Sequence, residues 1–126
     1  MTRLSSADVV AFVATTDKGR AREFYEGVLG FRVVHDDDFA CVVDANGTSL
    51  RITAVEERAG AEYTVLGWSV GDLEATIDEL VDRGVVFLHY DGIEQDERGV
   101  WVTPVGVRVA WFKDPDGNTL SLHTAG

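Results

Sequence analysis

The sequence contains one cysteine, two prolines and half as many basic residues as acidic ones. Cys41 has no partner for an intramolecular disulfide, which is typical of reducing compartments, so we expect a cytoplasmic protein. The cysteine lies in the apolar run FACVV, with no His or Lys beside it to lower its pKa. We therefore interpret Cys41 as a small buried hydrophobic residue rather than a nucleophile.

Positive charge is scarce, since 11 Lys and Arg stand against 22 Asp and Glu, for a formal net charge of −11. Nucleic acids and anionic membrane surfaces both require a basic patch, so neither is an expected partner. No apolar run approaches the roughly 18 residues of a membrane helix, and the N-terminal segment does not read as a signal peptide. The acidic surface could attract a cationic ligand or simply keep the protein soluble.

The 126 residues, 45% of them hydrophobic, are enough for one globular domain. The two halves of the chain repeat one pattern: an apolar run ending in Asp, an amphipathic segment closed by Gly, and then several apolar runs. Helical spacing predicts two helices. Asp17 and Gly30 would cap the first, and Asp72 and Gly84 the second. Their apolar stripes comprise Ala21, Phe24, Tyr25, Val28 and Leu29 in the first, and Leu73, Ile77, Leu80 and Val81 in the second.

The remaining apolar runs predict strands separated by turns. Asn46-Gly47 has the composition of a two-residue hairpin loop, and the DPDGN segment that begins at Asp114 that of a tight turn. Segment 92–99 is polar and could be a flap over a site or an ordinary surface loop. The expected strands cover residues 9–17, 31–35, 39–44 and 48–55 in the first half, and residues 63–72, 85–90, 101–104, 107–113 and 119–124 in the second.

Alternation along these strands separates an apolar face from a face of small polar residues. The polar face contains Ser49, Arg51 and Thr53 in one run, and Thr119, Ser121 and His123 in another. Such a face is either solvated or lines a ligand cavity. Trp68 would instead face the helices. Arg51 needs a partner if it is buried, either a carboxylate of the chain or an anionic group of a ligand.

Two segments, DKGRAREFYEGVLGFRVV and VAWFKDPDGNTLSLH, resemble the vicinal oxygen chelate superfamily of glyoxalase I, bleomycin resistance proteins, fosfomycin-modifying enzymes and extradiol dioxygenases. The similarity extends from about Val9 to His123. It implies an α+β fold of two βαβββ modules, at about 7–56 and 62–124, whose curved mixed sheets surround a cleft. It also implies a homodimer. The superfamily contains both enzymes and binding proteins, so the fold alone does not indicate a reaction.

The resemblance also implies where metal-dependent members hold their metal. The corresponding positions here are Val10, Arg51, Val65 and Ser121. Valine offers no donor atom, arginine repels a cation, and serine alone is a poor ligand, so we expect no metal and no other cofactor. Of the three histidines only His123 is on the predicted cleft face, whereas His35 and His89 end equivalent strands at an edge or surface. His123 could be a structural residue or a general base.

Two functions follow as alternatives. The first is a metal-free protein that binds a small molecule and sequesters an aromatic drug or metabolite. The second is a superfamily enzyme, such as a lyase, isomerase or dioxygenase, with displaced metal ligands or metal-free acid–base catalysis. Ser121 and His123 are two residues apart on one strand face, with roughly 7 Å between their Cα atoms, which is too far apart for a catalytic dyad. The expected ligand-binding residues are Arg51, Ser121, His123, Phe12, Ser49, Thr53, Ser69, Trp101 and Trp111.

Overall fold

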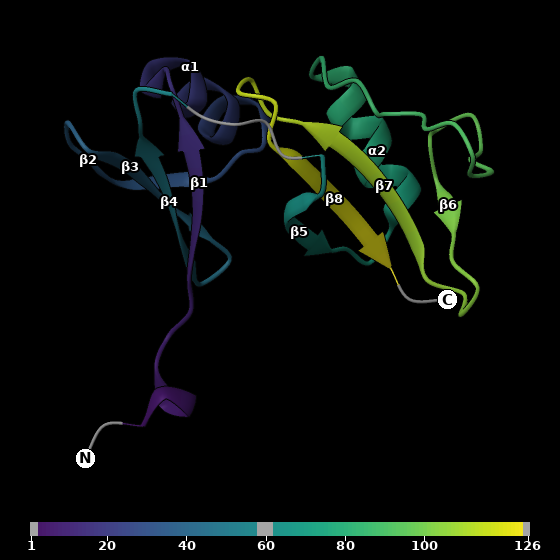
Figure 1. Ribbon diagram of the computed structural model, residues 1–126, viewed down its shortest axis with the longest axis horizontal. Coiled ribbons are helices and arrows are strands. Elements are labelled where there is room, and N and C mark those ends of the chain that lie inside the picture. Colours follow the sequence, from purple (N-terminus) through teal and green to yellow (C-terminus); the bar gives the residue numbers. More distant parts are fainter. Residues whose placement is uncertain (1–2, 58–61, 125–126) are drawn as a thin grey trace. The chain divides into compact units, whose positions relative to one another are not determined.

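The computed structural model describes residues 3–57 and 62–124 (Figure 1). The chain divides into an N-terminal unit, residues 1–58, and a C-terminal unit, residues 59–126. Each unit contains one mixed four-stranded sheet and one main helical segment, in the order strand, helix, three strands. The expected α+β fold of two βαβββ modules is confirmed.

The N-terminal unit begins with a short 3₁₀ turn and then forms a sheet in the order β1-β4-β3-β2. β1 runs parallel to β4, and the other neighbours are antiparallel. Leu50 and Ile52 of β4 are fully buried, as their alternation predicts. The elements are η1 (Leu4–Ser6), β1 (Val10–Thr15), α1 (Lys18–Arg22), η2 (Glu23–Val28), β2 (Arg32–Asp36), β3 (Ala40–Ala45) and β4 (Thr48–Ala54).

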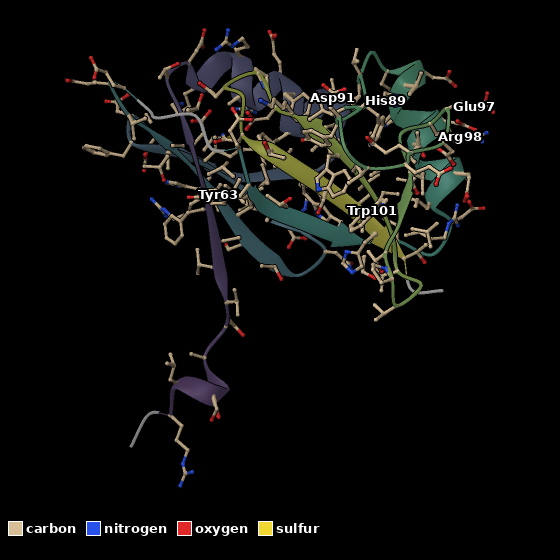
Figure 2. All side chains as sticks on the ribbon, turned by 45° about the vertical axis from the view of Figure 1, so that its right-hand side comes forward. Tyr63, His89, Asp91, Glu97, Arg98 and Trp101 are labelled. Atoms are coloured by element: carbon tan, nitrogen blue, oxygen red, sulfur yellow. The ribbon has the colours of Figure 1, made fainter. Side chains whose placement is uncertain are left out.

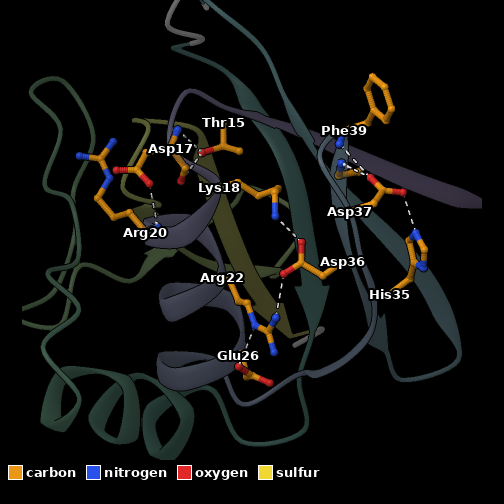
Figure 3. Close-up of polar contacts among 11 residues, drawn as sticks. Thr15, Asp17, Lys18, Arg20, Arg22, Glu26, His35, Asp36, Asp37 and Phe39 are labelled. Atoms are coloured by element: carbon orange, nitrogen blue, oxygen red, sulfur yellow. Dashed lines mark hydrogen bonds and ion pairs between the residues drawn. The ribbon is translucent and has the colours of Figure 1, made fainter.

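The first helix starts where the sequence predicts, because the Asp17 side chain accepts a hydrogen bond from the backbone N–H of Arg20 at 3.1 Å (Figure 3). It differs from the prediction in continuing as a π-helix, η2. Only Ala21 and Tyr25 of the predicted stripe are fully buried. Cys41 is also buried, and burial raises the pKa of its thiol, in agreement with an unreactive core residue.

Ion pairs connect the helical segment of this unit to β2 (Figure 3). Asp36 pairs with Lys18 and with Arg22, whose Nη1 lies 2.7 Å from the carboxylate. Arg22 also contacts Glu26 one turn later. Hydrogen bonds from the two cations lower the pKa of Asp36. All three side chains remain in partial contact with solvent, so we regard the network as a positioning contact with little net stabilisation.

The C-terminal unit repeats the arrangement, with strand order β5-β8-β7-β6. β5 is parallel to β8, and β7 is antiparallel to both neighbours. Asp72 caps α2 by accepting from Ala75 N, as predicted, whereas Val81 of the predicted apolar stripe is 49% exposed. The elements are β5 (Thr64–Ser69), α2 (Leu73–Asp82), β6 (Trp101–Val102), β7 (Arg108–Lys113) and β8 (Thr119–Thr124).

The prediction of a strand over 85–90 is wrong. Phe87 forms one isolated bridge with Phe112, and Leu88 N–H donates to the carbonyl of Trp111. The chain then leaves β7 and returns only at the two-residue strand β6, opposite Arg108 and Val109. The edge position that β2 fills in the first unit is thus divided in two, with a loop between the halves.

Both predicted turns are confirmed. Asn46 and Gly47 have φ values of 51° and 92°, as a two-residue hairpin loop requires. In the second turn, the Asp114 carboxylate accepts hydrogen bonds from the backbone of Asp116 and Asn118 and from the Asn118 side chain.

Candidate functional site

Trp111 lies over part of the polar face of the C-terminal sheet. The indole Nε1–H of this residue, on β7, donates to Oγ1 of Thr64, on β5, at 3.2 Å. β8 lies between these two strands, so the indole extends across it. Thr119 and Ser121 of β8 are consequently only 1% and 8% exposed, although they belong to the face predicted to be polar.

A pocket of about 370 Å³ opens beside this indole, within the C-terminal unit. Aromatic residues form much of its wall. Figure 2 shows Tyr63 just before β5 and Trp101 on β6, so the pocket draws on both edges of the sheet. The lining residues are Glu62, Tyr63, Thr64, Tyr90, Ile93, Trp101, Trp111 and Thr119.

Three of the lining rings form a continuous cluster. Trp101 and Trp111 are nearly parallel, with centroids 6.1 Å apart and an interplanar angle of 26°. Tyr90 meets Trp111 edge-on, at 5.4 Å and 81°. All three residues are half-buried, so part of each ring remains accessible. Flat, rigid aromatic walls of this kind bind apolar or aromatic groups at small entropic cost.

The loop that carries Tyr90 is held in place by the side chain of Gln95. Its Nε2 donates to the carbonyls of Leu88, at 2.9 Å, and Gly99, at 2.7 Å, while its Oε1 accepts from Tyr90 N–H at 2.6 Å. Its backbone also bridges to Trp101. Gln95 therefore connects two of the aromatic residues of the pocket.

A second contact attaches the same loop to α2. Arg98 donates from Nε and Nη2 to the two carboxylate oxygens of Asp78, at 2.9 and 3.0 Å. Such a bidentate pair has one favoured geometry. Segment 92–99 therefore has fixed contacts on both sides, which favours an ordered loop over the flap considered from the sequence.

The structure divides the expected site residues into two groups, one on each sheet. In the N-terminal unit, Ser49, Arg51 and Thr53 are half-buried on β4, and Phe12, 60% exposed, lies beside Arg51 on β1. Within the described residues, Arg51 has no ion pair and no side-chain hydrogen bond. Of the two partners considered for Arg51, a carboxylate of the chain is therefore not found among the described residues.

In the C-terminal unit, Trp101 and Trp111 line the pocket, whereas three other expected residues do not. Ser69 and His123 are neighbours at the ends of β5 and β8, and Ser121 packs beside Gly67. A Cβ atom placed on Gly67 would lie only 2.4 Å from Ser121 Oγ, so a side chain at position 67 would require Ser121 to move. Trp68 stacks on the buried Phe112, at 6.4 Å, as expected for the helix-facing side.

Several lining residues were missed by the sequence analysis. Tyr90 was interpreted as the last residue of a strand and Ile93 as part of the following loop, and Glu62, Tyr63 and Thr64 lie around the start of another expected strand. Only the density of aromatic residues near positions 63, 90 and 101 could have indicated them. Alternation was uninformative because these positions belong to loops and strand ends.

The positions at which the family resemblance implies a metal do not suit one here. Val10, Val65 and Arg51 offer no lone pair to a cation, and Ser121 is a weak neutral donor. Across residues 3–57 and 62–124, no group of three or more His, Cys, Asp or Glu side chains is placed to hold a metal ion. The side chains at these positions therefore do not fit a bound metal ion.

Comparison with known proteins identifies the family. The family model of the Glyoxalase/Bleomycin resistance protein/Dioxygenase superfamily matches residues 7–122. The chain belongs to this superfamily. No curated protein matches the chain.

Solved structures of the superfamily share the fold. A protein assigned to the glyoxalase family from Bacillus anthracis covers 100% of both chains, with a TM-score of 0.76 and 16% identity. The match to a glyoxalase/bleomycin resistance protein from Catenulispora acidiphila covers 96% of this chain and 100% of that protein, with a TM-score of 0.68 and 25% identity. The match to a lactoylglutathione lyase from Agrobacterium tumefaciens covers 97% of this chain and 96% of that protein, with a TM-score of 0.71 and 19% identity. At these identities the superfamily members show the fold rather than the reaction.

Among the helices that the structure describes, none has the length and apolar character needed to cross a membrane.

Proposed function

We propose that the chain is a metal-free binding protein of the superfamily, which holds an aromatic drug or metabolite in the pocket beside Trp111. The observation that carries this proposal is the cluster of Tyr90, Trp101 and Trp111 on one side of a 370 Å³ cavity. Small-molecule sites are typically concave and largely apolar, with a few polar groups that set orientation.

The hydrogen bonding of Trp111 supports an aromatic ligand. Its indole Nε1–H is already used by Thr64. The ring thus offers its π-system to a ligand, and the hydroxyls of Thr64 and Thr119 in the same lining offer the polar contacts. Stacking on such a ring contributes about 0.5–1.5 kcal/mol beyond the area buried.

The competing function is that of a superfamily enzyme, either with displaced metal ligands or with metal-free acid–base catalysis. Metal analysis of protein purified without chelator separates the two. We expect less than about 0.1 equivalent of Ni, Zn, Fe or Mn. A stoichiometric amount of any of them would contradict the metal-free proposal.

A ligand screen tests the pocket itself. We expect planar aromatic compounds to quench tryptophan fluorescence and raise the melting temperature, because binding to the native state alone stabilises it. Trp101→Ala should weaken binding about tenfold, whereas Trp68→Phe, on the helix-facing side, should change it less than twofold. If small carboxylates alone raise the melting temperature, Arg51 rather than the aromatic pocket is the anchor.

We also propose a cytoplasmic homodimer. β1 is an edge strand on which Val10 is 44% and Phe12 60% exposed, and Val9, just before it, is 74% exposed. Exposed apolar edge strands favour pairing with another chain. Light scattering after size exclusion should give twice the 13.7 kDa chain mass. Phe12→Asp should lower the measured mass to that of the monomer. Val86→Asp, at an exposed residue of the other unit, should leave the measured mass unchanged.

A further inference from the structure

The charge in the lining of the aromatic pocket is of one sign, negative. Among its described lining residues, Glu62 is the one charged side chain, and the others are aromatic, aliphatic or hydroxyl-bearing. No Lys, Arg or His lines this part of the described chain. Aromatic faces themselves carry partial negative charge, so the rings and the carboxylate act in the same direction.

We propose that this pocket selects a ligand with a methylated ammonium group, which binds over the faces of Trp101 and Trp111 beside the carboxylate of Glu62. This inference rests on the proposed binding function and adds the charge and shape of the group recognised. A cation over the face of an aromatic ring is attracted by the ring quadrupole, and most strongly by tryptophan.

The pocket favours a methylated cation over a simple ammonium ion. A compact ammonium would exchange several strong hydrogen bonds to water for the few acceptor oxygens of a lining that is mostly aromatic and aliphatic. A methylated group forms fewer such bonds to water and buries apolar methyl surface against the rings. Sets of aromatic rings are used for quaternary ammonium recognition for this reason.

The surroundings also favour a cation. Burial is the main cause of the raised pKa of Tyr90, and the charge of Glu62 adds to it, so the field of this carboxylate reaches the ring cluster. Lys113 is the strand partner of Thr119, but its side chain is exposed and not part of the lining. The nearby Arg108 is paired with Glu74. An anionic ligand would therefore lie beside a carboxylate that no cation of the described lining balances.

Calorimetric titration with three para-substituted benzenes tests the inference: the cation 4-(trimethylammonio)phenol, its neutral isostere 4-tert-butylphenol, and the anion 4-tert-butylbenzoate, which carries its charge at the other end of the ring. We expect the cation to bind about tenfold more tightly than the neutral isostere, and the anion more weakly than both. The preference should shrink at high salt, because the carboxylate is partly exposed.

Variants assign the preference to one residue. Glu62→Gln should weaken binding of the cation about fivefold. Its affinity for the neutral isostere should stay within twofold of that of the unmodified protein. Glu94→Gln is the matched control, since Glu94 is an exposed glutamate of the same unit outside the pocket lining, and it should leave all affinities within twofold.

The remaining outcomes contradict the inference in different ways. Equal binding of cation and neutral isostere, or tighter binding of the anion, would overturn the proposed charge selectivity while leaving the aromatic pocket supported. A preference for the cation that Glu62→Gln does not reduce would overturn the role of this carboxylate. Failure of all three probes to bind would contradict the pocket proposal as well.

Discussion

Trp111 on β7 is joined to Thr64 on β5 by a hydrogen bond from the indole Nε1–H to Oγ1, at 3.2 Å. This contact spans the strand between them and places an aromatic ring over hydroxyl-bearing residues of β8. The same ring forms the wall of the pocket and stacks with Trp101. The orientation of Trp111 therefore determines both the burial of β8 and the shape of the proposed site.

Replacing Thr64 with Val should release this ring while nearly preserving side-chain volume. The lost hydrogen bond should lower the free energy of unfolding by about 0.5–1 kcal/mol and weaken aromatic ligands about fivefold. Urea unfolding and fluorescence titration measure the two effects. Thr64→Ser keeps the hydroxyl, so its affinity for aromatic ligands should stay within twofold of that of the unmodified protein. Unchanged binding by Thr64→Val would show that the hydrogen bond does not orient the ring.

Replacing Gln95 with Leu should loosen the loop of residues 88–99. Three hydrogen bonds are lost, and the carbonyls of Leu88 and Gly99 lose their side-chain donor. We expect a loss of about 2 kcal/mol of stability and at least tenfold faster hydrogen exchange at the Tyr90 amide, measured by NMR. Glu94→Gln, one residue earlier on the same loop, is the control. Slow exchange at Tyr90 in Gln95→Leu would mean that other contacts hold the loop.

Gly67 and Ser121 provide a test of close strand packing. A Cβ at position 67 would lie 2.4 Å from Ser121 Oγ and 3.3 Å from its backbone oxygen. Gly67→Ala should therefore destabilise the protein by about 1–2 kcal/mol, and the added Ser121→Ala should recover most of the loss. Gly71→Ala, where a Cβ meets no atom within 4 Å, should change stability by less than about 0.5 kcal/mol. Thermal or urea unfolding of these three variants decides the question.

The carboxylate of Asp37 should produce a pH-dependent contribution to stability. Hydrogen bonds from His35, and from the backbone of Phe39 and Ala40, lower its pKa from 3.8 to about 2 (Figure 3). Because the folded-state pKa lies below the unfolded one, the stabilisation is complete above pH 3.8. It declines as the pH falls toward about 2 and is absent below.

Asp37→Asn measures this contribution. The variant should melt at a lower temperature than the unmodified protein at pH 6, and the difference should shrink as the pH approaches 2. Asp38→Asn, at an exposed neighbouring carboxylate, is the control and should show a smaller difference throughout. A difference for Asp37→Asn that does not depend on pH would indicate an effect of shape rather than charge.

Local chemistry made much of the fold predictable. Asp17 and Asp72 cap their helices because a carboxylate next to an apolar stripe satisfies free backbone N–H groups at the first turn. Asn46-Gly47 forms its hairpin because these residues tolerate positive φ. The strand over 85–90 was mispredicted because its apolar side chains resemble those of a strand, while hydrogen bonding to β7 is limited to its centre.

The candidate site was less predictable, because its residues meet only through pairing of distant strands. The sequence by itself determined the two modules, the absence of suitable side chains at the metal positions, and the aromatic character of Trp101 and Trp111. Tertiary structure decided that Thr64 reaches Trp111 across β8 and that Glu62 and Tyr90 share one pocket. The physical reason is strand order. Alternation reports which face a residue occupies, whereas its neighbours on that face depend on the order β5-β8-β7-β6.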